Sequence, residues 1–505
     1  MINSWVALSC YAIELLIGFW SRKVFLDFLG SELLGLNTTA TNLLQFLNIA
    51  ELGIGSAVAF TLYKPLSQND FNAINEIISV QGWLYRKIAN IVAIGAAVMM
   101  CFFPLIFSKI ELPLWYAYSS FGVFLYSSLL TYYFNYRQIA LSASQQEYKI
   151  TISYKSFIII KNIVQIIAIS HFSHPYIWWL ILQIVFATLA SISLNVQIKR
   201  TFPNLKPNVK QGRLIKEKYS IIIIKVKQLF FHKIGGFVLF QTSPLIIYAY
   251  STLTTVAIYG NYMLVINGLT MILNAIFNGL NAGIGDLVAE GNIKRIKSVF
   301  DELFAFRFLM VTSILYCFYY LINSFITIWI GENYLFSDII LLLLVTNTFI
   351  MMMRGIVDSF IAAYGLFKDI WAPIIEAVLN LSLSIILGYF YGIQGVLLGV
   401  NISLFLVIFI WKPYFLFKKG LQISLLHYIK LYLIHILVFI FSVYLTSNML
   451  NHLLCFEVQS YVDFFRKAII SFFIFSLVEV ILLYLITDSM KLFVKRFLKL
   501  IRLVK

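Results

Sequence analysis

The sequence predicts an all-α polytopic membrane protein with about fourteen transmembrane helices. Hydrophobic residues make up 61% of the 505 residues and charged residues only 12%, whereas a soluble chain carries about a quarter charged residues. Apolar runs of roughly 18–25 residues, each long enough to cross about 30 Å of hydrocarbon, recur from one end to the other. The connections between these runs are short, so no soluble catalytic domain is expected.

The expected spans can be placed along the chain by their approximate centres. The first run begins without a basic n-region or a cleavage site, so it is expected to be a retained helix and not a signal peptide. The spans near Ile13, Ile163 and Ile246 are shorter or more polar than the others. In chain order the centres lie near Ile13, Ile49, Ala96, Val123, Ile163, Ile184, Ile246, Leu273, Ile314, Phe349, Ser382, Phe405, Val438 and Phe475.

Basic residues are unevenly divided between the two sides of the predicted membrane. Counted from a cytoplasmic N-terminus, the inside connections hold most of them, including dense runs at 199–233 and 491–505. The positive-inside rule therefore places both termini in the cytoplasm and requires an even number of helices. The net charge of +16 is thus a topology signal, and no nucleic-acid partner is expected. The outside connections hold only Arg22, Lys23, Lys109, Arg466 and Lys467.

A basic linker and an internal repeat predict two halves. Residues 199–230 are rich in lysine and arginine and follow the sixth span. A shift of 230 residues lays Asn37, Asn48, Glu51, Gly53 and Gly55 on Asn267, Asn278, Asn281, Gly283 and Gly285. Because six helices separate the copies, the two six-helix lobes would be related by a parallel pseudo-two-fold axis. We therefore expect an N-terminal lobe at 1–198, a cytoplasmic linker at 199–230, a C-terminal lobe at 231–417, and two extra helices with a basic amphipathic tail at 418–505. The tail is expected to lie on the anionic inner leaflet.

Two polar stripes lie at matching places in the two halves. The spacing puts each stripe on one face of a helix. Unpaired amides and carboxylates cost kilocalories in hydrocarbon, so these faces must meet other helices or a wet cavity. Hydrogen bonding between helices, with Gly53 and Gly55 allowing close approach, is the structural alternative. The matching positions favour a shared central cavity. The stripes are Thr41, Gln45, Asn48, Glu51 and Gly55, and Asn267, Asn274, Asn278, Asn281 and Gly285.

Five ionisable residues lie at membrane depth: Glu14, Lys161, Arg354, Asp358 and Glu376. Each costs about 2.5–3.5 kcal/mol at a helix centre, so such residues are candidates for a transport pathway. Arg354 and Asp358 stand at i and i+4 and could neutralise each other. Lys161 has no partner in its own helix, and a neighbouring carboxylate, an anionic substrate or snorkelling to the interface all stay open. Glu14, Asp358 and Glu376 are candidates for coupling transport to a proton or sodium ion, with structural pairing as the alternative.

Other motifs predict no cofactor and no catalytic site. Cys10, Cys101, Cys317 and Cys455 are widely separated and are expected to be packing residues. His171 and His174 have no carboxylate nearby, which argues against a metal site. The sequence contains no P-loop, so this chain is not expected to bind ATP.

At residues 21–70 the chain reads "AELGIGSA" and "LYKPL", and later "FHKIGG", "YGNY" and "GIGDLVAEG". This set of motifs resembles the bacterial polysaccharide transporters, the O-antigen and capsule flippases. Their superfamily also contains the multidrug exporters. One departure is the helix after "FHKIGG", where the family often carries Asn or Asp and this chain has only Gln241, Thr242 and Ser243.

The resemblance implies two lobes around a V-shaped cavity that opens alternately to either side of the bacterial cytoplasmic membrane. The implied substrate is an oligosaccharide repeat unit joined by pyrophosphate to a polyprenyl lipid. Membrane lipids, a polysaccharide polymerase and assembly proteins would be its partners. Such a headgroup needs amides and fixed cations. Lys161 and Arg354 are therefore the expected pyrophosphate partners, with Asn48, Glu51, Asn278 and Asn281 lining the cavity.

Two other classes of function are weighed against flipping. A multidrug exporter or a cell-wall-precursor lipid exporter would share the fold, but a drug cavity is expected to hold a carboxylate and little fixed positive charge. A polytopic polysaccharide polymerase or acyltransferase usually carries a sizeable outside loop. The outside loops here are too short for that class.

Overall fold

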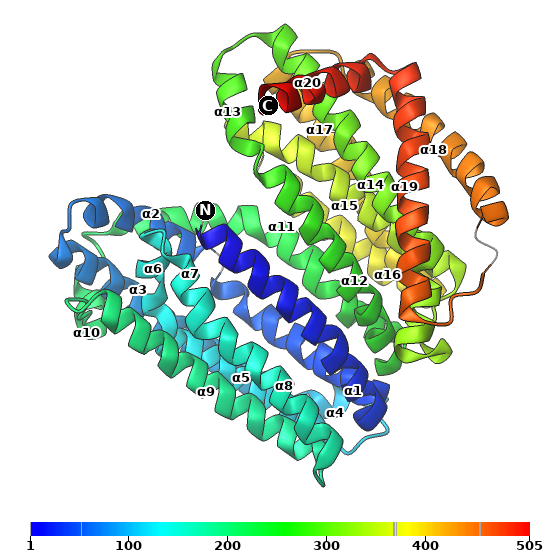
Figure 1. Ribbon diagram of the computed structural model, residues 1–505. Coiled ribbons are helices and arrows are strands. Elements are labelled where there is room, and N and C mark those ends of the chain that lie inside the picture. The colour runs from blue at the N-terminus through cyan, green and yellow to red at the C-terminus, as the bar shows by residue number, and fades with distance from the viewer. Residues whose placement is uncertain (1, 52, 367–368, 370, 454–455, 505) are drawn as a thin grey trace. The chain divides into compact units, whose positions relative to one another are not determined.

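The computed structural model describes residues 2–504 apart from 52, 367–368, 370 and 454–455. Within that part of the chain the regular structure is entirely helical. The chain divides into two compact units, Met1–Gly260 and Asn261–Lys505. The helices of both units are labelled in Figure 1. The helix α12 (Leu253–Asn278) begins in the first unit and ends in the second.

The first unit is built from long helices joined by short helical turns. Helices α8 and α9 form a closely packed pair, and α1 packs against α5, α8 and α11 (Figure 1). The helices are α1 (Ile2–Leu47), α2 (Ile54–Ser67), α3 (Phe71–Cys101), α4 (Phe103–Ile106), α5 (Trp115–Tyr133), α6 (Ile139–Ala143), α7 (Glu147–Ile150), α8 (Ser156–His171), α9 (Pro175–Thr201), α10 (Val209–Ile215) and α11 (Ser220–Tyr250).

In the second unit the long helix α14 lies at the centre of the packing. It contacts α15, α18, α19 and α20, and its buried phenylalanines Phe300, Phe304 and Phe308 form the middle of the core. The helices are α13 (Asn281–Ala289), α14 (Ile293–Ile330), α15 (Asp338–Ala363), α16 (Trp371–Leu404), α17 (Lys412–Leu416), α18 (Leu425–Leu453), α19 (Tyr461–Ile486) and α20 (Asp488–Val504).

The predicted spans correspond to helices of the structure, which confirms the all-α polytopic fold class. Two centres fall outside α-helix: Ile49 lies in the 3₁₀ turn Asn48–Glu51, and Phe405 lies in the π-helical turn Phe405–Trp411. Of the helices described, nine are long and apolar enough to cross a membrane. That number is below fourteen partly because Trp371–Leu421 counts once although it is kinked at Gly392. The helix α1, whose backbone is non-helical at Gly30, is not among these nine described helices.

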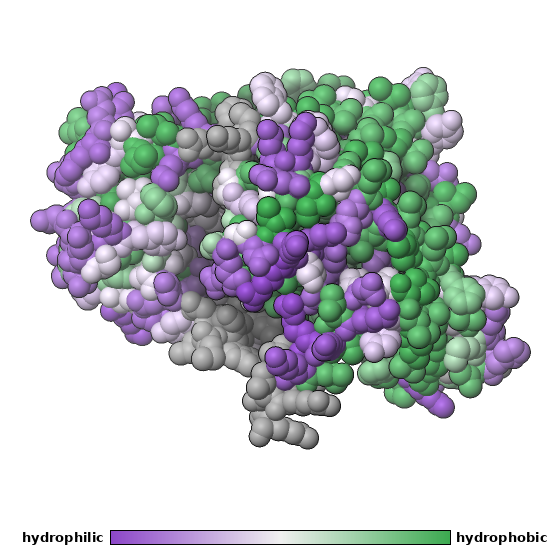
Figure 2. Space-filling model, turned by 90° about the horizontal axis from the view of Figure 1, so that it is seen from above, coloured by the Kyte–Doolittle hydropathy of each residue, from purple (hydrophilic) through white to green (hydrophobic). Residues whose placement is uncertain are grey.

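Exposed apolar side chains are consistent with a lipid-facing surface. Large hydrophobic residues are exposed along many of the long helices, for example Leu437 on α18 and Leu477 on α19. In the view of Figure 2, hydrophobic side chains cover much of the right of the picture. Together with the nine apolar helices of the described chain, these exposed side chains indicate a multi-pass membrane protein.

The predicted linker at 199–230 is structured and held to α3. The side chain of Asn75 donates to the carbonyl of Asn204 at 3.0 Å and accepts from the amide of Lys206 at 2.7 Å. The Ser79 hydroxyl accepts from the amide of Asn208 at 2.8 Å. The division between the compact units falls later, within α12. The assignment of the helices to two six-helix lobes remains a prediction.

The basic tail forms the amphipathic helix α20, which packs on α14. Arg496 pairs with the buried carboxylate of Glu302 at 3.0 Å, and the rings of Phe306 and Phe493 stack with centroids 4.5 Å apart. Leu492 remains exposed on α20. The tail is thus anchored to the second unit and still presents apolar and basic side chains.

Candidate functional site

The polar stripe of the second predicted span lies at a break in the helix. The helix α1 ends at Leu47, the 3₁₀ turn Asn48–Glu51 follows, and α2 begins after Gly53. Gly53 has φ +92°, a conformation that residues with a Cβ rarely adopt. A Cβ there would also lie 2.8 Å from the Cβ of Leu229 on α11. Glycine at this position therefore permits both the change of direction and the close approach of α11.

The break presents an amide and a carboxylate that hydroxyl groups hold in place. The Asn48 Oδ1 accepts hydrogen bonds from Ser128 at 3.2 Å and from Tyr132 at 2.9 Å, both on α5. The Glu51 Oε1 accepts from the Tyr85 hydroxyl of α3 at 3.0 Å. The rings of Tyr85 and Tyr132 lie 5.7 Å apart and are buried. Asn48 and Glu51 are therefore oriented by helices distant in sequence.

These groups open onto a cavity of about 590 Å³ within the first unit. All five residues of the predicted stripe line it. The predicted single helical face is wrong in its geometry, because the helix is interrupted at Asn48, but the stripe still faces one hollow. The lining is Thr41, Leu44, Gln45, Asn48, Glu51, Gly53, Gly55, Ser56, Phe124, Ser127, Ser128, Thr131, Tyr132 and Gln241.

The lining is suited to a polar, hydroxyl-rich group. Hydroxyls, amides and one carboxylate offer both donors and acceptors around the hollow. In the part of the chain that is described, Glu51 forms no ion pair, and this lining holds no lysine or arginine. The negative charge of Glu51 would thus also favour a cation in the cavity. Irregular backbone at membrane depth is tolerated where it lines such a cavity.

The second unit repeats the break at the matching position. The helix α12 ends at Asn278 and α13 begins at Asn281, which correspond to Asn48 and Glu51 under the shift of 230 residues. The Asn281 Oδ1 accepts from Ser359 of α15 at 2.8 Å, and Asn267 is exposed. The side chain of Asn278 lies outside the described residues. The repeat is thus visible in the backbone as well as in the sequence.

Lys161 on α8 does not line this cavity and is held by an amide. Its Nζ donates to Gln183 of α9 at 2.7 Å. Glu14, a candidate partner from a neighbouring helix, pairs instead with Lys155 at 2.7 Å, and that ammonium also lies 3.8 Å from the ring centroid of Tyr11. Glu14 of α1 therefore pairs with Lys155 and not with Lys161.

Arg354 belongs to a four-residue ion cluster. Its Nε donates to Asp358 at 2.6 Å, and its Nη1 lies 3.7 Å from Glu376 of α16. Lys412 donates to the other oxygen of Asp358 at 2.7 Å. Two cations and two carboxylates make the cluster neutral. The structural pairing of Arg354 with Asp358, one of the two alternatives, is what the structure shows, and a role of the cluster in transport stays a prediction.

Sequence reasoning missed several residues that organise these sites. In the sequence, nothing distinguishes Tyr85 and Tyr132 from the many other aromatic residues of a membrane protein. Nothing distinguishes Lys412 from the other basic residues of the cytoplasmic connections. Arg307 also looks like a basic residue of a cytoplasmic connection, yet it is buried in the second unit and donates to the carbonyl of Met352 at 2.6 Å. The signal that could have revealed Arg307 is its depth within the 38-residue helix α14.

The fold is similar to those of a flippase and of transporters whose structures are solved. The solved structure of the lipid II flippase MurJ in an inward closed conformation is similar, with a TM-score of 0.65 and 13% identity over 95% of this chain and 98% of that chain. The inward-facing structure of a multidrug resistance MATE family transporter of the MOP superfamily gives a TM-score of 0.57 and 11% identity over 83% of this chain and 99% of that one.

A third solved structure, that of a mutant of the Vibrio cholerae MATE transporter VcmN, has a TM-score of 0.50 and 13% identity over 83% of this chain and 99% of that chain. No protein-family model and no curated protein sequence matches this chain significantly. At these identities the similarity establishes the fold alone. The helical membrane fold agrees with the fold class predicted from the sequence.

Proposed function

We propose that this chain flips a polyprenyl-pyrophosphate-linked oligosaccharide across the bacterial cytoplasmic membrane by alternating access. The product would supply surface polysaccharide, such as O-antigen or capsule. The observation that carries the proposal is the cavity at the helix break, where Asn48, Glu51 and neighbouring hydroxyls converge in a membrane-embedded unit. Sugar hydroxyls both donate and accept hydrogen bonds, and this lining offers partners for both.

The full-length similarity to a flippase supports the same class of substrate. The MurJ structure covers 95% of this chain, whereas the MATE structure covers 83%. MurJ is named as a lipid II flippase. The motifs around Glu51 and Gly283, which resemble the polysaccharide transporters, point to a lipid-linked oligosaccharide as the substrate here.

One observation favours a second candidate, export of cationic drugs. Lys161 and Arg354 are the residues that argue against it in the sequence, and neither lines the cavity around Glu51. A carboxylate in a hollow that has no basic residue among its described lining would attract a cation. The same carboxylate could instead bind a coupling proton or sodium ion in a flippase. Lipid flipping and drug export therefore have to be compared directly by experiment.

A transport assay with reconstituted protein distinguishes lipid flipping from drug export. Purified protein in liposomes is given a polyprenyl-pyrophosphate oligosaccharide labelled on the sugar, and flipping is followed by chemical quenching of the outer label. We expect flipping by the wild type, and a rate about tenfold lower for Asn48→Leu, which corresponds to about 1.4 kcal/mol. The control Glu147→Gln changes an exposed residue outside the cavity and should leave the rate unchanged.

The contrary results are equally specific. Absence of flipping by the wild type, or an unchanged rate in Asn48→Leu, would remove this cavity from the substrate path. Export of ethidium by the wild type that is lost in Glu51→Gln, with no flipping, would establish the multidrug exporter instead.

A further inference from the structure

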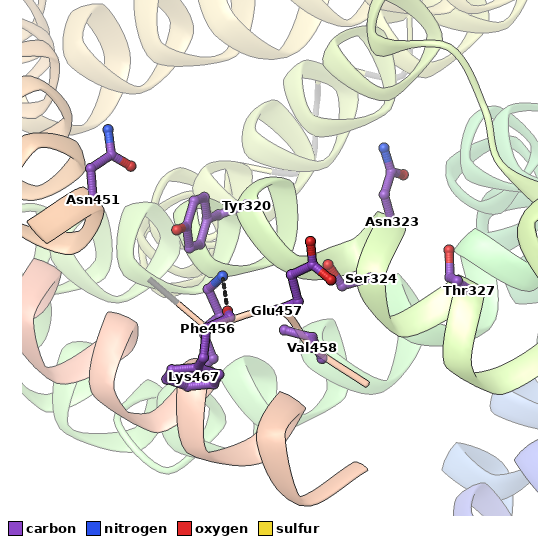
Figure 3. Close-up of a pocket in the computed structure, with 9 residues that line it drawn as sticks. All are labelled: Tyr320, Asn323, Ser324, Thr327, Asn451, Phe456, Glu457, Val458 and Lys467. Carbon is purple, nitrogen blue, oxygen red and sulfur yellow. Dashed lines mark hydrogen bonds between the residues drawn. The ribbon is translucent and has the colours of Figure 1, made fainter. Parts of the chain in front are cut away.

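A second polar hollow lies at one end of the second unit. It has a volume of about 680 Å³, within the range of roughly 300–1,000 Å³ that small-molecule sites occupy. Its walls are the last turns of α14, the end of α18, the connection that follows residue 455 and the first turns of α19 (Figure 3). The distribution of basic residues assigns this end to the outside of the membrane.

Aromatic rings and an ammonium form one side of the hollow. The Lys467 Nζ lies 5.5 Å from the ring centroid of Tyr320 and 5.8 Å from that of Phe456. It also donates to the Phe456 carbonyl at 3.5 Å, drawn as the dashed line in Figure 3. The Tyr320 ring is nearly parallel to that of Tyr316, with an interplanar angle of 7°. The ring is thus held in position at the wall.

Polar groups on α14 and on the connection form the other side. Asn323 and Ser324 follow Tyr320 by three and four residues, so the three side chains share one face of α14. The Asn323 Oδ1 accepts from the Tyr262 hydroxyl at 3.2 Å, which leaves its amide NH₂ to donate elsewhere. The Glu457 carboxylate lines the same hollow as Ser324 (Figure 3), and within the described chain it forms no ion pair. Donors, an acceptor and aromatic surface therefore converge.

This combination matches the chemistry of a saccharide. A sugar ring has an apolar C–H face that packs on an aromatic ring and a rim of hydroxyls that need donors and acceptors. The polar lining is unsuited to a lipid chain, because burying these groups against hydrocarbon leaves them unpaired. Glu457 and Lys467 together leave the site without net charge.

We propose that this hollow binds the glycan part of the transported molecule on the outer side, after it has crossed the membrane. The proposal rests on the proposed function, because only a glycan exporter presents sugar to this face. The site is separate from the cavity around Glu51, which is lined by residues of the other unit. Its wide opening suits weak binding, so that the product is released.

Sugar binding can be measured on the full-length protein in nanodiscs by saturation-transfer NMR. The probes are methyl glycosides of glucose, galactose, N-acetylglucosamine and glucuronic acid, each at millimolar concentration. We expect at least one probe to bind the wild type, and Tyr320→Leu and Glu457→Gln each to weaken that binding about tenfold. Glu457 is exposed, so its variant is expected to fold even if Tyr320→Leu does not.

Matched controls separate this site from general effects. Tyr319→Leu changes the exposed neighbour of Tyr320, and Glu332→Gln changes an exposed carboxylate at the end of α14, so both should bind the probes like the wild type. Absence of binding by the wild type, or equal binding by Glu457→Gln, overturns the proposal.

The flipping assay separates failure of this inference from failure of the proposed function. Flipping without any sugar binding at this hollow overturns the outer site and leaves the flippase intact. Sugar binding that depends on Tyr320 and Glu457, in a protein that does not flip the lipid-linked probe, supports a saccharide site and refutes flipping.

Discussion

Asp358 offers a test of whether the ion cluster in the second unit is structural. Its carboxylate lies 2.6 Å from Arg354 and 2.7 Å from Lys412. At an effective dielectric constant of about 20, each contact is worth roughly 4–6 kcal/mol before the desolvation cost. Removing one partner of a buried pair costs about 3–5 kcal/mol. The Asp358 side chain is 37% exposed and the pair is therefore not fully buried, so we expect Asp358→Asn to destabilise the protein by about 2–3 kcal/mol.

The charge balance predicts a specific rescue. Asp358→Asn leaves two cations and one carboxylate, whereas the double variant Asp358→Asn with Lys412→Gln restores neutrality through Arg354 and Glu376. The double variant should therefore be more stable than the sum of the two single changes predicts. The measurement is the apparent Tm of purified protein, in one detergent and at one scan rate, because unfolding of such proteins is often irreversible.

Asp338→Asn is the matched control, because Asp338 is an exposed carboxylate at the start of the same helix, α15. A Tm for Asp358→Asn equal to that of the control, or strictly additive effects in the double variant, would refute the structural interpretation. Loss of transport at unchanged Tm would instead place Asp358 among the residues that handle substrate or a coupling ion.

Three further changes test the sites that the tertiary structure revealed. Gly53→Ala should destabilise the protein by about 1–3 kcal/mol, because of the positive φ and the close approach of α11, and should lower the Tm. Gly355→Ala should also lower the Tm, since its methyl group would overlap the guanidinium of Arg307. Tyr132→Phe removes one of the hydroxyls that orient Asn48 and should slow flipping about five- to tenfold, the effect of a hydrogen bond worth about 1 kcal/mol.

Each change has a control in the same region. Gly55→Ala adds a methyl group 3.9 Å from the Tyr85 hydroxyl, an ordinary contact, and Gly283→Ala adds one with no atom within 4 Å. Tyr133→Phe removes an exposed hydroxyl bonded to Asn90. Equal effects of a change and its control would contradict the packing or hydrogen-bond argument behind that prediction.

Local sequence properties predicted the positions of the helices well, because a helix in hydrocarbon needs a long apolar run and little else. The two centres that missed α-helix, near Ile49 and Phe405, lie where the backbone turns more tightly or more widely than an α-helix. Near Ile49, Gly53, Gly55 and the polar stripe singled out this segment in the sequence. The sequence alone did not show that the helix breaks there, nor that α11 closely approaches Gly53.

The polar stripe in the first unit was predicted as a set, and its hydrogen-bond partners were not. Periodicity groups Thr41, Gln45, Asn48 and Glu51, because it depends only on spacing along the chain. The hydroxyls of Ser128 and Tyr132 approach Asn48 from α5, about eighty residues away. No pattern in a single sequence connects such positions.

The sequence by itself determined the membrane class, the helical spans and the expected sidedness. These properties depend only on the length of each apolar run and on the position of basic residues along the chain, and not on contacts between distant residues. Only the tertiary structure decided which buried charges are paired. Lys161 meets Gln183, Glu14 meets Lys155, and Asp358 takes Lys412 as a second partner. The physical reason is that a charge in a low-dielectric interior is stabilised by whichever group folding brings within a few ångströms.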